Sequence, residues 1–134
     1  MRSRLSLTVD QASRLMILRY IGDMEGGEIN TSMMQQLAAL DQPWAYDSIV
    51  DMRRFEGVVL ADEIQDLGMR WAMLAQGRDR NRSTAIISED PLVHARVSIT
   101  QGAFPFRTVA VFGTLDEGLD WIQARRDAGQ QAVA

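Results

Sequence analysis

The chain of 134 residues contains no lysine and no cysteine, and its single histidine is His94. All 14 basic residues are therefore arginines; they face 18 acidic residues, and the formal net charge is −4. Without lysine there is no Schiff-base amine and no phosphate-loop lysine. Without cysteine there is no thiol nucleophile, disulfide bond or thiolate metal site. One histidine excludes a multi-histidine metal site within one chain, so we expect neither a metal nor a cofactor.

The sequence also lacks an excess of positive charge and any apolar run of the roughly 20 residues that a membrane span needs. A net negative chain is a poor match for nucleic acid or for an anionic membrane surface. Its composition, 46% hydrophobic and 24% charged, is that of a globular protein. We expect a single domain over residues 1–134, located in the cytoplasm.

Short apolar segments alternate with amphipathic ones along most of the chain. Strands are predicted at 5–9, 16–21, 47–52, 84–87 and 108–112, and helices at 29–40, 60–74, 90–102 and from 114 onward. This β-β-α-β-α-β-α-β-α order predicts an α/β fold with a mixed, mostly parallel sheet of four or five strands. The first two strands are joined by a short turn, so they should form an antiparallel hairpin at the edge.

Helix starts carry recognisable capping residues. Asp90 precedes Pro91, an arrangement typical of a cap followed by the first helical residue. Thr114 with Glu117, and Ser32 with Gln35, have the spacing of a capping box.

Three strings resemble the SpoIIAA-like group of proteins, relatives of the STAS (anti-sigma-factor antagonist) domain. They are Ser48-Ile-Val-Asp-Met-Arg53, Thr84-Ala-Ile-Ile-Ser88 and the stretch from Thr108-Val-Ala-Val-Phe112 to Trp121-Ile122. The resemblance covers about residues 15–125, which it marks as the core of the domain. It implies a sheet of four or five strands with helices, and no established catalytic activity. It also implies that the chain works by binding a protein partner.

One departure from that group concerns its switch. Where sigma-regulating antagonists carry a phosphorylatable serine at a helix start, this chain reads Val58-Val-Leu-Ala-Asp62-Glu63-Ile64, without serine or threonine. Phosphorylation at that place is therefore not expected. Asp62 and Glu63 either imitate the phosphorylated state or simply cap the helix, whose N-terminus favours acidic side chains.

Arg53 and Arg54 are predicted to lie in the loop 53–57, just after a central strand. Ligands of open α/β sheets tend to bind outside such strand ends, and paired arginines can hold a phosphate or carboxylate. Ser88 should lie at the same edge, beside a helix start. Acidic neighbours, among them Asp51, offer the alternative of surface ion pairs.

Met69 and Met73 lie four residues apart, on a helix face beside the one that carries Leu67 and Leu74. Methionine surfaces adapt to apolar partners, so this face, if exposed, would bind a protein partner or a second copy of the chain. If buried, it would belong to the core.

We therefore predict a non-enzymatic regulatory or protein-interaction module that uses Arg53, Arg54, Asp62, Glu63, Met69 and Met73. The alternative is a carrier of a small apolar or anionic ligand, with an architecture resembling the CRAL-TRIO lipid-transfer fold. Catalysis finds little support, because His94 lacks a nucleophile on a Gly-x-Ser-x-Gly turn. An enzyme would need a deep pocket lined by Asp51, Arg53 and Ser88.

Overall fold

A computed structural model describes residues 3–133, in which five strands form one sheet flanked by helices. The strands are β1 (Arg4–Asp10), β2 (Leu15–Gly22), β3 (Asp47–Phe55), β4 (Ser83–Ile87) and β5 (Thr108–Phe112). The helices are α1 (Gly26–Ala38), α2 (Ala61–Ala75), α3 (Pro91–Ala95), α4 (Val97–Ala103) and α5 (Leu115–Val133), with a 3-10 turn at Pro43–Ala45. None of the helices in this part of the chain is long and apolar enough to span a membrane.

The strands lie in the order β1-β2-β3-β4-β5, and only the β1–β2 pair is antiparallel. The prediction of a mixed, mostly parallel sheet with a hairpin at its edge is therefore confirmed. A four-residue turn suffices to reverse the chain between β1 and β2, whereas each parallel pair needs a crossover through a helix.

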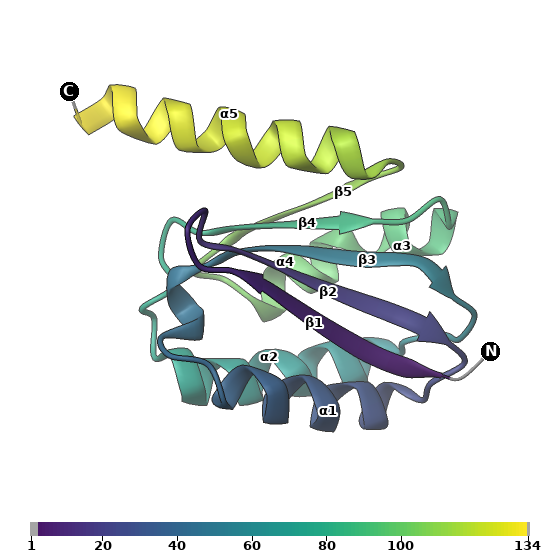
Figure 1. Cartoon of the computed structure of the whole chain (residues 1–134). Helices are drawn as coiled ribbons and strands as arrows, with labels where there is room; N and C mark the ends of the chain where they lie inside the picture. The colour runs from purple at the N-terminus through teal and green to yellow at the C-terminus, as the bar shows by residue number, and fades with distance from the viewer. Residues whose placement is uncertain (1–2, 134) are drawn as a thin grey trace.

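Helices cover both faces of the sheet, with α1 and α2 on one side and α5 on the other (Figure 1). All five residues of β4 are buried, because a strand covered on both faces meets no solvent. A side chain at Gly118 would overlap the Ile87 side chain, so this glycine allows α5 to pack directly on β4. The larger apolar cluster lies on the side of α1 and α2, where the candidate site is found.

The capping predictions have different outcomes. The Asp90 carboxylate accepts the Leu92 N–H at 2.9 Å, and the Thr114 hydroxyl accepts the Glu117 N–H at 3.2 Å, so these two caps are confirmed. The predicted cap at Ser32 is wrong, because α1 begins earlier, at Gly26, and Ser32 lies in its middle. An apolar periodicity locates a helix face but does not fix the turn at which the helix begins.

Two boundaries also differ from the sequence prediction. The helix predicted over 90–102 is divided at Arg96, whose φ of −98° and ψ of 7° leave the helical region. Strand β3 continues to Phe55, so Arg53 and Arg54 lie in a strand and not in the predicted loop. The extension arises because β2 still offers backbone partners there: Gly22 is aligned with Phe55.

Candidate functional site

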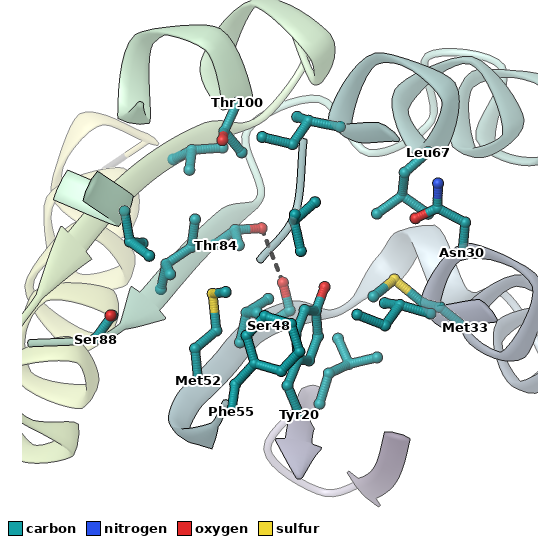
Figure 2. Close-up of a pocket in the computed structure, with 18 of the residues that line it drawn as sticks. Tyr20, Asn30, Met33, Ser48, Met52, Phe55, Leu67, Thr84, Ser88 and Thr100 are labelled. Carbon is teal, nitrogen blue, oxygen red and sulfur yellow. Dashed lines mark hydrogen bonds between the residues drawn. The ribbon is translucent and has the colours of Figure 1, made fainter. Parts of the chain in front are cut away.

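A cavity of about 180 Å³ lies between one face of the sheet and the helices α1, α2 and α4 (Figure 2). Most of its lining is apolar. The sheet contributes Met16, Leu18, Val50, Ile86 and Val109; the helices contribute Ile29, Met33 and Leu67; and Phe104 follows the end of α4. Such a concave, largely apolar space with a few polar groups is the usual form of a small-molecule site.

A bulge in β3 shapes one end of the cavity. Between the aligned pairs Arg19–Asp51 and Ile21–Arg54, β3 has one residue more than β2. The extra residue shifts the alternation of side chains, so Met52 and Phe55 both line the cavity although they are three residues apart. An unbroken strand would place these two side chains on opposite faces.

Tyr20 of β2 extends into the cavity with its hydroxyl group leading (Figure 2). Its side chain is buried, with 7% of its surface exposed, and the hydroxyl forms no hydrogen bond with any group that the structure describes. Burial raises the pKa of Tyr20, so the group remains protonated and able to donate at neutral pH. A donor without an acceptor is therefore directed into an apolar space.

Further polar groups line the same cavity. The hydroxyls of Ser48 and Thr84 are hydrogen-bonded at 2.8 Å across β3 and β4, and both are buried (Figure 2). Asn30 of α1 donates its two amide hydrogens to the Glu63 carbonyl at 2.9 Å and to Asp66 Oδ2 at 3.1 Å. Its own carbonyl oxygen accepts no hydrogen bond within the described chain, so Asn30 offers the cavity an acceptor.

The cavity meets solvent between the segment 57–59 and α3. Val58 and Leu92 both line the cavity and are nevertheless 57% and 42% exposed, which marks them as its rim. Arg96, at the junction of α3 and α4, donates a hydrogen bond of 2.6 Å to the Val59 carbonyl. This bond joins the two sides of the opening.

At the opposite end the cavity contacts a buried charged network. Arg107 donates to the Tyr46 carbonyl at 2.8 Å and lies 3.7 Å from Asp79, which also accepts the Trp71 indole N–H at 2.8 Å. Burial lowers the pKa of Arg107 to about 10, with Asp79 opposing that shift. The guanidinium thus remains charged at neutral pH, and its charge is balanced by Asp79.

The arginines singled out in the sequence lie away from this cavity. Arg53 donates Nε and Nη2 to the two carboxylate oxygens of Asp51, both at 2.9 Å. This hydrogen-bonded guanidinium lowers the pKa of the Asp51 carboxyl, which is itself buried. Of the three residues that an enzyme would have needed together, Asp51, Arg53 and Ser88, only Ser88 lines the cavity. Arg54, the neighbouring arginine, is aligned with Ile21 of β2.

Asp62 and Glu63 begin α2, as predicted. The Glu63 carboxylate accepts the Leu60 N–H at 2.7 Å and also lies against Gly26, where α1 begins. Glu63 therefore serves as a helix cap, while the Asp62 side chain is exposed.

Met69 and Met73 are the most exposed large apolar side chains in the described chain, at 71% and 80%. They lie on the outer side of α2, beside a shallow groove formed with α4 through Gly68, Ala72 and Ile99. Of the two alternatives left open by the sequence, an exposed face and a face buried in the core, the structure shows the exposed face.

His94 joins two elements of the fold. The His94 ring nitrogen Nε2 is 2.7 Å from the Ser88 carbonyl, a contact that connects α3 to the end of β4. Within residues 3–133 no three histidine, aspartate or glutamate side chains come close enough to hold a metal ion.

Tyr20 was not recognised as a site residue from the sequence. It lies in an apolar segment, and its neighbours give no sign that a void faces it. Only its polar hydroxyl, at a position expected to face the core, could have drawn attention.

Comparison with known proteins supports the fold. No protein-family description matches the sequence, and no curated protein matches it significantly. Among solved structures, an uncharacterised DUF3478-family protein from Shewanella loihica PV-4, described as having a SpoIIAA-like fold, is similar with a TM-score of 0.58 and 14% identity. That match covers 89% of this chain and 92% of the other.

A second similar structure is the anti-sigma factor antagonist SpoIIAA in its unphosphorylated form. Its TM-score is 0.50 at 14% identity, and the match covers 90% of this chain and 98% of SpoIIAA. Both matches cover about nine-tenths of this chain, in agreement with the resemblance noted in the sequence. The chain therefore has a SpoIIAA-like fold.

Proposed function

We propose that the chain is a non-enzymatic regulatory module of the cytoplasm that acts through protein–protein contact, with the outer face of α2 as its binding surface. The observation that carries this proposal is the exposure of Met69 and Met73, one helical turn apart. Adjacent exposed methionines are costly to leave in water and adapt readily to an apolar partner.

The charges around α2 favour a second copy of the chain as that partner. Asp62 is exposed at the start of the helix, and Arg80 is exposed just beyond its end. Two α2 helices packed antiparallel about a two-fold axis would bring the methionines of both copies together. The same arrangement would place the acidic end of each helix near the basic end of the other, as a self-complementary interface requires.

Regulation of this module would not use phosphorylation at the start of α2. The segment 58–64 contains no hydroxyl side chain, and the Glu63 carboxylate already occupies the cap. Control by expression level, by self-association or by a bound small molecule would be compatible with this arrangement.

Analytical ultracentrifugation over a range of protein concentrations tests the proposal. We expect the wild-type protein to dimerise and the double variant Met69→Asp/Met73→Asp to remain monomeric, because buried carboxylates would oppose the contact. Val58→Asp is the matched control, since Val58 is also exposed but lies away from the outer face of α2. A wild-type protein that stays monomeric throughout, or a double variant that still dimerises, contradicts self-association through this face.

Transport or sensing of a small apolar molecule is a second candidate function, and the cavity is the observation that favours it. The space has the size and lining of a ligand site and opens between Val58 and Leu92. Native mass spectrometry of the purified protein tests this function. A molecule of defined mass that co-purifies would support it, and one that is displaced by Leu18→Trp would be placed in the cavity.

A further inference from the structure

We infer that the cavity accepts an uncharged molecule about the size of one aromatic ring, carrying an oxygen atom that accepts a hydrogen bond from the Tyr20 hydroxyl. This inference rests on the second candidate function, small-molecule binding, and specifies the chemical class of the ligand. It is independent of whether the outer face of α2 binds a second copy.

The volume of the cavity limits the size of the ligand. Apolar voids of roughly 150 Å³ in protein cores remain dry and take up benzene. The cavity described above has about 180 Å³, which leaves room for a ring and a short substituent. A longer molecule would have to extend past Val58 and Leu92 into solvent.

The unpartnered hydroxyl of Tyr20 determines where the polar atom of the ligand lies. A buried donor without an acceptor lowers stability, whereas the same donor directed at a ligand oxygen gains the full hydrogen bond. Because burial raises the pKa of Tyr20, the hydroxyl does not lose its proton at neutral pH. The Phe55 ring meets the Tyr20 ring at 87° and so restricts its orientation.

The charged groups at the cavity explain why the ligand should be neutral. The guanidinium of Arg107 is balanced by Asp79. Arg96 has no carboxylate partner among the described residues, but it lies at the opening, where its guanidinium donates to the Val59 carbonyl and where Asp90 also lines the cavity. A carboxylate taken into the interior would therefore lose its hydration beside an arginine whose charge is already balanced. A ketone, aldehyde or alcohol loses less, and the Tyr20 hydroxyl replaces a hydrogen bond from water.

Three probes with equal numbers of non-hydrogen atoms test the inference by calorimetric titration of the full chain. They are acetophenone, which carries a carbonyl oxygen, cumene, which has no polar atom, and benzoate, which is charged. The ratio of acetophenone to cumene affinity should fall about tenfold in Tyr20→Phe, the change that loss of one hydrogen bond produces. Tyr46→Phe is the matched control, because Tyr46 is the other tyrosine, is buried and does not line the cavity.

The possible results distinguish two failures: the wrong chemical class of ligand, and no binding of a small molecule at all. Binding of cumene and acetophenone with a ratio that Tyr20→Phe leaves unchanged would overturn the role of Tyr20 and leave the second candidate function intact. Binding of none of the probes to the wild-type protein would overturn both. Benzoate as the tightest probe would overturn the neutral assignment. Thermal unfolding of Tyr20→Phe verifies that the variant is folded before it is titrated.

Discussion

The aromatic rings of Tyr20 and Phe55 meet edge to face, with their centroids 5.5 Å apart and their planes at 87°. The two residues come from neighbouring parallel strands and face each other only because a bulge in β3 turns Phe55 toward the cavity. Edge-to-face pairs of this kind contribute about 1 kcal/mol beyond the burial of their area. The pair therefore both stabilises the sheet and fixes the wall from which the Tyr20 hydroxyl projects.

Removal of the two cavity hydroxyls should have opposite consequences for stability. Tyr20→Phe deletes an unpartnered group, so we expect the free energy of unfolding to stay constant or rise by up to about 1 kcal/mol. Ser48→Ala leaves the Thr84 hydroxyl without its buried partner and should lower the free energy of unfolding by about 1–2 kcal/mol. Urea denaturation of both variants measures the difference. A clear loss of stability in Tyr20→Phe would indicate that the hydroxyl has a partner.

The close contact of α2 and α4 depends on Gly68. A methyl group at this position would overlap the Ala103 backbone, so Gly68→Ala should destabilise the protein by about 1–3 kcal/mol. Gly102→Ala is the matched control on the facing helix, because no atom lies within 4 Å of the added carbon. There, the better helix propensity of alanine should stabilise by up to about 1 kcal/mol. Equal melting temperatures for the two variants would contradict the contact.

The Asp51–Arg53 pair should make stability depend on pH. The Arg53 side chain lowers the folded-state pKa of Asp51 below its ordinary 3.8, so the pair stabilises the fold above that value. This contribution is lost as the pH falls through the lowered pKa. Arg53→Ala should therefore cost about 1 kcal/mol at neutral pH, a modest figure because the Arg53 side chain is 45% exposed.

Denaturation of the wild type and Arg53→Ala at a series of pH values measures that contribution. We expect the two stability curves to approach each other as the pH falls below the ordinary pKa of Asp51 and to converge below its lowered folded-state pKa. A difference that stays constant into acid would mean that Arg53 acts through packing and not through charge. Arg78→Ala provides a control arginine, since Arg78 pairs with no carboxylate that the structure describes.

The buried Asp79–Arg107 pair should behave non-additively. Asp79→Leu would leave the Arg107 guanidinium buried and uncompensated, at a cost of about 3–5 kcal/mol. The double variant Asp79→Leu/Arg107→Met removes both charges and should recover much of that loss. Guanidinium denaturation of the two single variants and the double variant completes the cycle. If the double variant is as unstable as the sum of the singles, the two charges do not interact.

Much of the fold could be predicted from sequence because it depends on local patterns. The apolar residues of 84–87 and 108–112 identify strands, and the caps at Asp90 and Thr114 identify helix starts. The expectation that both strands are buried holds for β4 but not for β5, an edge strand in which only Val109 is buried. The cap assigned to Ser32 failed because serine three residues before glutamine also occurs inside a helix. The prediction of a continuous helix over 90–102 failed because the backbone leaves the helical region at Arg96, and the apolar spacing on either side does not show this interruption.

Some features of the candidate site could likewise be predicted from local sequence patterns, and others could not. The exposed methionines of α2 follow from helical spacing, because residues four apart share a face. The pairing of Arg53 with Asp51 was foreseen as one alternative, since the two residues are close in sequence. The sequence suggested a ligand cavity only through the resemblance to a carrier fold, and it did not identify the residues that line the cavity. Those residues come from segments spread between positions 16 and 109, so no local pattern reveals them.

The sequence alone determined the α/β class, the order of the strands along the chain and the absence of thiol, amine and multi-histidine chemistry. Side-chain types and short-range periodicity suffice for these conclusions. The tertiary structure decided which side chains line the cavity: Tyr20 and Phe55 do, and Arg53 does not. One extra residue in β3 reverses which face each later side chain takes, and that shift exists only in the pairing of β3 with β2.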